Sequence, residues 1–216
     1  NQLLLDFDYE QNFKDDDFYV GKSNFYPFEL INNWPKWEKN FLNINGEKFS
    51  GKTHLTNIFL KKFNGIRIES ESLNDENLKK IKPYQNVVLE NLNLDVNEKL
   101  IYTLFNIIDQ DNKFLIITSS EPLSEIDFRL VDLKSRTKNC IIAKIENPDD
   151  ELMFALILKN LSDRQITLDK KLIDFIIKRV ERSYGKIFEF IYKIDKISLK
   201  KKKSIDFKII NEALEE

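Results

Sequence analysis

Glycine, proline, cysteine and histidine are scarce in this chain. Its 216 residues contain five glycines, five prolines, one cysteine and one histidine. The single cysteine, Cys140, excludes a disulfide within the chain and fits a reducing cytoplasm. Because Cys140 begins a short apolar run at 140–143, it is expected to be a small core residue, not a nucleophile.

Long apolar runs and an excess of one charge are also missing. No stretch approaches the length of a membrane span, and no secretory signal is visible. The net charge is −2, so the surface as a whole is not expected to attract a polyanion. A length of 216 residues allows one core, or a main domain with a small appendage. We therefore expect a cytoplasmic protein with no membrane contact.

Two of the five glycines fall in one segment, 46–53. It reads G-E-K-F-S-G-K-T and satisfies the phosphate-binding pattern G-x-x-x-x-G-K-[ST]. Glycine lets the backbone curl so that successive N–H groups face phosphates, and the following helix adds the positive end of its dipole. A strand pattern at 40–45 and a helical pattern at 54–63 disfavour a glycine turn that binds nothing. The segment therefore predicts a bound nucleoside di- or triphosphate, held by Gly46, Ser50, Gly51, Lys52 and Thr53.

Strand and helix patterns alternate from Phe18 to about Asn147. The candidate strands are 41–45, 65–69, 86–90, 113–118 and 140–145, and the helices between them are 54–63, 74–81 and 97–111. Alternation of this kind behind a phosphate-binding loop predicts a parallel sheet with helices on both faces.

Only helical patterns follow Pro148. They cover residues 149–160, 169–182, 186–197 and 206–214, with Asp169 as a candidate N-cap. We expect a flexible N-terminal segment (1–17), an α/β nucleotide-binding domain (18–147) and a helical lid (148–216). An α/β class with a five-stranded parallel sheet and a small C-terminal all-α lid is the plan of an AAA+ module.

Glu90 ends an apolar run, where a P-loop ATPase needs a second Mg²⁺ anchor beside Thr53. An acid that merely ends a strand would give the same pattern. Asn91 follows at the place where an AAA+ ATPase usually carries the acid that polarises the attacking water. Because an amide cannot accept that proton, we expect tight nucleotide binding with slow or no turnover.

Four other polar features are less specific. Ser119 fits a sensor of the γ-phosphate and equally fits the start of a turn. Arg136 precedes an edge strand, from which an arginine can enter a neighbouring subunit's active site, although most arginines are surface residues. The basic run at 200–203 is typical of a solvated linker, which leaves a direct DNA contact open. His54 follows the loop, where a lone histidine packs more often than it catalyses.

Taken together, the motifs resemble those of the DnaA-related AAA+ family over essentially the whole chain. Segment 18–24 (F-Y-V-G-K-S-N) is similar to the family's segment that packs around adenine, which implies Phe18 and Val20 as nucleotide contacts. His54, directly after the loop, is also expected to contact the nucleotide. Segment 132–136 (D-L-K-S-R) is similar to the arginine-finger box, which implies that Arg136 acts in trans. Three further segments resemble the family's sheet-to-lid junction and lid helices: 147–151, 161–166 and 178–183. The resemblance implies a bacterial protein that binds ADP or ATP with Mg²⁺.

One lid position departs from the family. The second-sensor arginine would fall on or near Gly185, and Arg182, one turn earlier, is its candidate substitute. Together with Asn91, this departure favours an ADP-bound, non-hydrolysing state in which a partner's own machinery carries out hydrolysis.

The two ends resemble a regulatory branch of the family more than DnaA itself. With Glu216 as the last residue of the sequence, we expect no counterpart after the lid to the helix-turn-helix DNA-binding domain of DnaA. Residues 1–7 (N-Q-L-L-L-D-F) resemble the Q-L-x-L-x-[FL] peptide that docks on the sliding clamp of DNA polymerase. Such a peptide places a glutamine in a polar notch and apolar side chains in pockets, and the candidates here are Gln2, Leu3, Leu5 and Phe7. A terminal strand or an apolar patch packed on the core is the alternative for these residues.

The resemblance implies a negative regulator of DNA replication initiation. The sliding clamp, loaded on DNA, would recruit the chain, which would then promote ATP hydrolysis by the initiator DnaA. DNA would be contacted only through the clamp, and whether the chain is a monomer or a homodimer stays open. A helicase loader is the alternative and requires competent turnover and a single-strand DNA-binding surface. A small-molecule kinase ranks last because its lid is usually rich in arginine.

Overall fold

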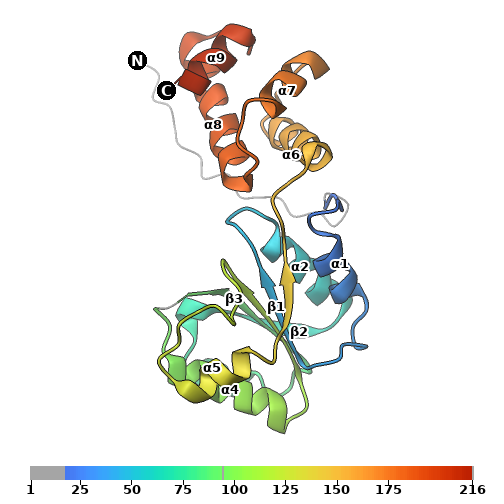
Figure 1. The fold of residues 1–216 in the computed structure, drawn as a ribbon, viewed down its shortest axis with the longest axis vertical. Coiled ribbons are helices and arrows are strands. Elements are labelled where there is room, and N and C mark those ends of the chain that lie inside the picture. Colours follow the sequence, from blue (N-terminus) through green and yellow to red (C-terminus); the bar gives the residue numbers. More distant parts are fainter. Residues whose placement is uncertain (1–17, 94, 216) are drawn as a thin grey trace.

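A five-stranded parallel sheet forms the centre of the larger part of the molecule (Figure 1). The computed structural model describes residues 18–93 and 95–215. The strands are β1 (Phe41–Asn45), β2 (Gly65–Glu69), β3 (Asn86–Leu92), β4 (Phe114–Ser119) and β5 (Ile141–Lys144). They lie in the order β2-β3-β4-β1-β5, and every neighbouring pair is parallel. The predicted α/β fold with a five-stranded parallel sheet is confirmed.

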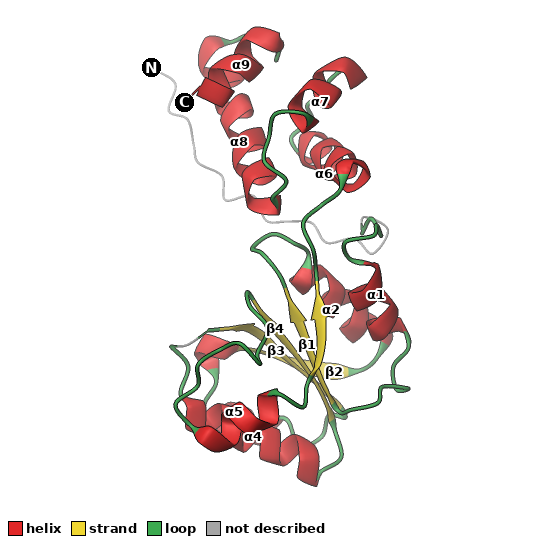
Figure 2. Cartoon of the chain, viewed as in Figure 1, coloured by secondary structure: helices red, strands yellow, loops and turns green. Residues whose placement is uncertain are grey.

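Helices cover both faces of the sheet, as Figure 2 shows. They are α1 (Phe25–Asn32), α2 (Lys52–Lys62), the 3-10 turn η2 (Ser70–Ser72), α3 (Asp75–Lys80), α4 (Glu98–Gln110) and α5 (Val131–Thr137). Val88 and Ile116 pack against α1 and α2 in one apolar cluster. Their strand neighbours Val87 and Leu115 point to the opposite face and pack with α4. Burial on both faces explains why the central strands β1, β3 and β4 read as mostly apolar runs.

Four helices at the C-terminal end form a separate layer, called the lid below. They are α6 (Asp150–Asp163), α7 (Lys170–Ile177), α8 (Tyr184–Lys201) and α9 (Phe207–Glu215). The lid has an apolar cluster of its own, which includes Met153, Ile191 and Ile210. In Figure 1 it lies beyond one end of the sheet and is joined to it by the segment between β5 and α6. None of the described helices, the 18-residue α8 included, is both long and apolar enough to cross a membrane.

Three helical features differ from the prediction. α1 and α5 are short helices that the sequence pattern did not indicate, because only two side chains of each are buried. The helix expected over 169–182 ends at Ile177, where the amides of Arg179 and Val180 both bond to the carbonyl of Ile176 and close a turn. Asp169 stands at the N-cap position of α7 as expected, but its side chain makes no capping hydrogen bond.

Candidate nucleotide-binding site

The phosphate-binding loop lies between the end of β1 and the start of α2. Gly51, the last residue before α2, has a φ of 96°, and a Cβ there would lie 3.1 Å from the Phe18 ring. A Cβ at Gly46 would lie 3.1 Å from the Cβ and carbonyl oxygen of Ile145 and from Ser50 Oγ. The backbone conformation and the close neighbours at both positions therefore require glycine.

Lys52, the first residue of α2, is 9% exposed. Its Nζ donates to the carbonyl oxygens of Gly46 (2.6 Å) and Glu47 (2.8 Å). Burial lowers the pKa of this ammonium below its usual range, and the negative charges of Glu90 and Glu47 oppose that shift. The side chain of Lys52 therefore bonds to backbone carbonyl groups at the start of its own loop.

Glu90 is fully buried at the end of β3, where the pairing of β3 with β4 shifts register between Leu89 and Leu92. Its carboxylate accepts hydrogen bonds from Thr118 Oγ1 at 2.6 Å and from Thr56 Oγ1. Thr53 Oγ1 lies 3.5 Å from Glu90 Oε2. The two predicted metal-associated side chains, Thr53 and Glu90, therefore lie next to one another.

Arg67 of β2 supplies the charge beside this buried acid. Its Nε lies 3.7 Å from Glu90 Oε1, and its Nη2 donates to Thr56 Oγ1 (3.2 Å) and to Asn57 Oδ1 (2.5 Å). Burying a carboxylate costs free energy unless a countercharge and hydrogen-bond donors accompany it. The sequence pattern did not single out Arg67, because its side chain meets Glu90 only through the pairing of β2 with β3.

Asn91 has a φ of 56°, in the left-handed region that asparagine tolerates better than most residues. Its backbone N–H donates to Thr118 Oγ1 at 2.8 Å, and its Nδ2 donates to Glu69 Oε2 at 3.1 Å. The Asn91 amide, which the sequence analysis noted in place of the usual acid, is therefore paired with a carboxylate of the neighbouring strand.

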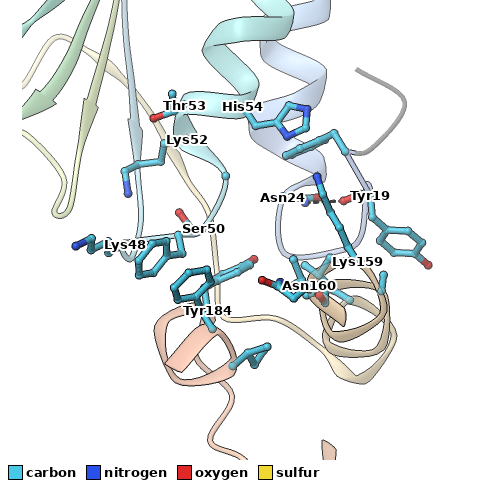
Figure 3. Close-up of a pocket in the computed structure, with 18 of the residues that line it drawn as sticks. Tyr19, Asn24, Lys48, Ser50, Lys52, Thr53, His54, Lys159, Asn160 and Tyr184 are labelled. Atoms are coloured by element: carbon cyan, nitrogen blue, oxygen red, sulfur yellow. Dashed lines mark hydrogen bonds between the residues drawn. The ribbon is translucent and has the colours of Figure 1, made fainter. Parts of the chain in front are cut away.

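A pocket of about 350 Å³ opens beside the loop (Figure 3). Its wall comes from the loop, from the segment before α1, and from lid helices α6 and α8. Residues in that wall include Phe18, Tyr19, Lys48, Ser50, Lys52, Thr53, His54, Asn91, Lys159, Asn160 and Tyr184. The edge of the His54 ring meets Phe18 with centroids 5.1 Å apart, which gives this side of the pocket an aromatic surface. An aromatic surface beside a phosphate loop suits a nucleotide base.

Several features of the loop fit a nucleotide's phosphates. Ser50 is 3% exposed, and within the described part of the chain its hydroxyl has no hydrogen-bond partner. The N-terminus of the 11-residue α2 lies at the same place.

Among described residues no group of three or more histidine, cysteine, aspartate or glutamate side chains could hold a metal alone. A Mg²⁺ ion here would depend on Thr53, Glu90 and oxygens of the nucleotide.

Four of the predicted nucleotide-binding residues are not part of the described wall of this pocket: Gly46, Val20, Ser119 and Arg182. The Ser119 hydroxyl is buried, where it donates to the carbonyl of Glu121 (2.6 Å) and accepts from Asn43 Nδ2 (2.8 Å). Arg182 pairs instead with Asp150 on the lid, its Nη2 2.8 Å from Oδ1. Val20 belongs to the segment before α1, but its neighbours Phe18 and Tyr19 form the wall.

Arg136 lies on α5, immediately before the edge strand β5. Its guanidinium forms an ion pair with Asp109 of α4 and stands 5.3 Å from the centre of the Tyr102 ring. The side chain is about one third exposed. The predicted clamp-binding residues, in contrast, lie outside the described residues.

The sequence pattern missed two contributions to this site. Asn24 organises the segment before α1, since its Oδ1 accepts from Gly21 N (2.8 Å) and its Nδ2 donates to the Tyr19 carbonyl (2.9 Å). Asn160 and Tyr184 bring the lid to the pocket from more than 100 residues away along the chain. No local signal marks the lid residues, because their role depends on how the lid packs over the loop.

The sequence is similar to known initiator proteins. No protein-family model matches it. An uncharacterized protein of Haemophilus influenzae is 27% identical over 190 residues, covering 81% of each chain. The chromosomal replication initiator protein DnaA of Helicobacter hepaticus is 26% identical over 197 residues, and that of a Thermoanaerobacter species is 25% identical over 228 residues. These matches cover 80% and 93% of this chain but 42% and 51% of the DnaA proteins, so the chain spans about half their length.

Solved structures agree on the fold. Domain III of the Thermotoga maritima replication initiation protein DnaA matches with a TM-score of 0.74 and 19% identity, covering 95% of this chain and 97% of that one. AMPPCP-bound DnaA from Aquifex aeolicus matches with a TM-score of 0.70 and 21% identity over 88% of this chain and 66% of that one. A RuvB branch migration motor from Thermotoga maritima matches at 0.60, with 16% identity over 82% and 61%. The chain therefore has the AAA+ fold of DnaA domain III.

Proposed function

We propose that the chain binds an adenine nucleotide, ADP or ATP, together with Mg²⁺ in the pocket beside the 46–53 loop. The complete motif, the buried Ser50 hydroxyl and the Thr53–Glu90 pair support this assignment. A DnaA of the same fold has been solved with AMPPCP bound. The nucleotide would supply phosphate charge to the loop, while the protein's residues hold and orient it.

The nucleotide serves as a structural ligand, turned over slowly or not at all. Asn91 cannot accept a proton from water, and its amide is occupied by the Glu69 carboxylate. Gly185 offers no side chain where the family carries its second-sensor arginine. A steady-state ATPase assay tests this point, and turnover stimulated by single-stranded DNA would favour the helicase loader instead.

The role that fits best is that of an Hda-type negative regulator of replication initiation. In this proposal residues 2–7 dock on the DNA polymerase sliding clamp, and the AAA+ module then acts on ATP-bound DnaA. One observation carries the proposal: a DnaA-like AAA+ module and a clamp-type peptide, Q-L-L-L-D-F, occur in the same chain.

Arg136 is the residue proposed to act on the partner. It lies beside the edge strand β5, where another molecule can approach the sheet. To reach a partner's site the guanidinium must leave Asp109, with which it is paired at a partly exposed position. Its charge would then stabilise the phosphoryl group being transferred in the partner.

Clamp binding is the first experiment. We expect micromolar or tighter binding of the full chain to the sliding clamp, and loss of that binding when Gln2, Leu3 and Phe7 are changed to alanine, because anchor side chains of a short peptide carry most of its affinity. Surface plasmon resonance with immobilised clamp measures both. No binding by the unchanged chain would exclude the clamp-recruited mechanism.

Arg136→Ala and Asp109→Ala form a matched pair for the catalytic step. Both break the same ion pair, but only the first removes the guanidinium. We expect Arg136→Ala to lower the stimulation of DnaA ATP hydrolysis by roughly tenfold or more, and Asp109→Ala to retain it. Equal loss in both variants would show that the pair matters only for structure.

A further inference from the structure

The phosphate-binding loop and the lid are joined through one side chain, Glu47. Its carboxylate accepts hydrogen bonds from the backbone N–H groups of Tyr184 (3.1 Å) and Gly185 (3.0 Å) and from the Ser183 hydroxyl. These groups form the N-terminus of α8, whose first amides have no partners within the helix. The loop thus supplies an acceptor and a negative charge to the positive end of the longest lid helix.

A second contact joins the same two elements. Phe49 of the loop stacks on Phe188, one turn into α8, with ring centroids 4.5 Å apart and planes 15° from parallel. Phe49 has a φ of 68°, a left-handed conformation that is uncommon for a bulky residue. Two of the four variable positions of the motif, Glu47 and Phe49, therefore contact the lid.

Gly185 leaves the space that Glu47 occupies. A Cβ built at Gly185 would lie 2.9 Å from Glu47 Oε1, which is closer than such contacts normally come. Any larger residue at 185 must push the carboxylate aside. The family's second-sensor arginine would fall on or near Gly185. The absence of a side chain at Gly185 therefore leaves room for the Glu47 carboxylate.

Lys52 connects this contact with the ligand site. Its Nζ donates to the carbonyl of Glu47, the same residue whose carboxylate holds α8. A phosphate group that drew Lys52 toward itself would remove that hydrogen bond and so change the environment of the Glu47 backbone. A movement of Glu47 would in turn alter its hydrogen bonds to the N-terminus of α8.

We infer that Glu47 is a latch that ties the position of the lid to the conformation of the phosphate-binding loop, so that nucleotide occupancy regulates the surface the lid presents. The regulatory part of this inference rests on the nucleotide binding proposed above. The latch itself rests only on the contacts of Glu47 with α8.

Hydrogen exchange at the start of α8 tests the latch directly. In Glu47→Ala the amides of Tyr184 and Gly185 should exchange roughly tenfold faster or more, because the change removes the carboxylate that accepts their hydrogen bonds. Glu125→Ala, which removes an exposed acid from the loop after β4, should leave this exchange unchanged. Unchanged exchange in Glu47→Ala would overturn the inference.

Thermal unfolding of the double variant gives an independent test. Alanine forms helix better than glycine, so in the Glu47→Ala background Gly185→Ala should raise Tm by up to about 2–4 °C. In the background that retains Glu47 the same change should give a smaller gain or a loss, because it displaces the carboxylate. Equal effects in both backgrounds would mean that the two residues do not interact and would overturn the latch.

Nucleotide dependence is measured last. ADP should slow exchange at 184–188 in the unchanged chain and should have a clearly smaller effect in Glu47→Ala. Isothermal titration calorimetry with ADP tests nucleotide binding separately from the regulatory role of Glu47. Without ADP binding to the unchanged chain the proposed function and the regulatory role both fail, while the latch contact is judged by the first two tests. ADP binding with equal protection in both proteins would overturn the regulatory role alone.

Discussion

Cys140 shows how burial controls the chemistry of a single residue. Burial raises the pKa of its thiol from 9.0 to about 12, with a smaller opposing effect from the charge of Lys39. The thiolate is the reactive form, so this shift lowers reactivity near neutral pH by about a thousandfold relative to an unfolded chain. The structure agrees with the sequence-based expectation that Cys140 is a core residue.

We predict that Cys140 in the native protein reacts at least about a thousandfold more slowly with a thiol reagent at pH 8 than it does in denaturant. Absorbance with Ellman's reagent follows the reaction. The raised folded pKa also has a stability consequence: its contribution is complete below about pH 9 and is lost as the pH rises toward 12. Rapid labelling of the native protein at pH 8 would contradict the buried position.

At the scale of the element, β1 depends on a polar side chain in its middle. Asn43 is fully buried, and its Nδ2 donates to the Ile117 carbonyl (3.1 Å) and to Ser119 Oγ (2.8 Å). Its Oδ1 accepts from the backbone N–H of Leu123 at 3.0 Å. One asparagine thus joins β1, β4 and the loop that follows β4.

We predict that Asn43→Ala lowers the free energy of unfolding by about 2–4 kcal/mol, because it leaves buried groups without partners and opens a cavity. Urea denaturation followed by circular dichroism measures the change. Asn40→Ala is the matched control, since Asn40 bonds to Asn112 at an exposed position, and it should change stability by no more than about 0.5 kcal/mol. An equal loss in both variants would contradict a special role for Asn43.

The central strands β1, β3 and β4 could be predicted from the sequence because each is a mostly apolar run that the sheet buries on both faces, whereas the edge strands β2 and β5 are only partly buried. The positions of α1 and α5 could not be predicted in the same way, since only Pro27 and Ile31 of α1 and Leu133 and Thr137 of α5 are buried. Amphipathic periodicity needs several buried side chains before it becomes visible.

The loop of the candidate site was predictable because a phosphate-binding motif is local in sequence. Its contacts with the lid were not, since Glu47 occupies a position that the motif leaves open and Gly185 lies 138 residues away along the chain. The same holds for Arg67, which supports Glu90 from a neighbouring strand. Such contacts depend on tertiary packing and produce no periodic pattern in the sequence.

At the scale of the whole molecule, the pocket is shared between the sheet-containing part and the lid. Lys52 and His54 line it from α2, and Asn160 and Phe188 line it from the lid. A ligand that contacts both parts stabilises them together, by an amount that depends on its concentration relative to Kd.

We predict that ADP at 100 times its Kd raises the free energy of unfolding of the unchanged chain by about 2.7 kcal/mol, and that Lys52→Ala removes this effect. Differential scanning fluorimetry across an ADP series makes the comparison. Lys62→Ala removes a lysine from the exposed end of the same helix, where it bonds to Asn32, and should keep the full response. A response that survives in Lys52→Ala would place the ligand elsewhere.

The order of the strands also decides how the native sheet meets other sheets. Its two edges are β5, four residues long and ending in Lys144, and β2, which carries Arg67 and Glu69. Short strands with charged side chains are poor templates for an additional strand. The folded protein is thereby protected from edge-to-edge polymerisation, and aggregation in concentrated solutions should begin from unfolded chains.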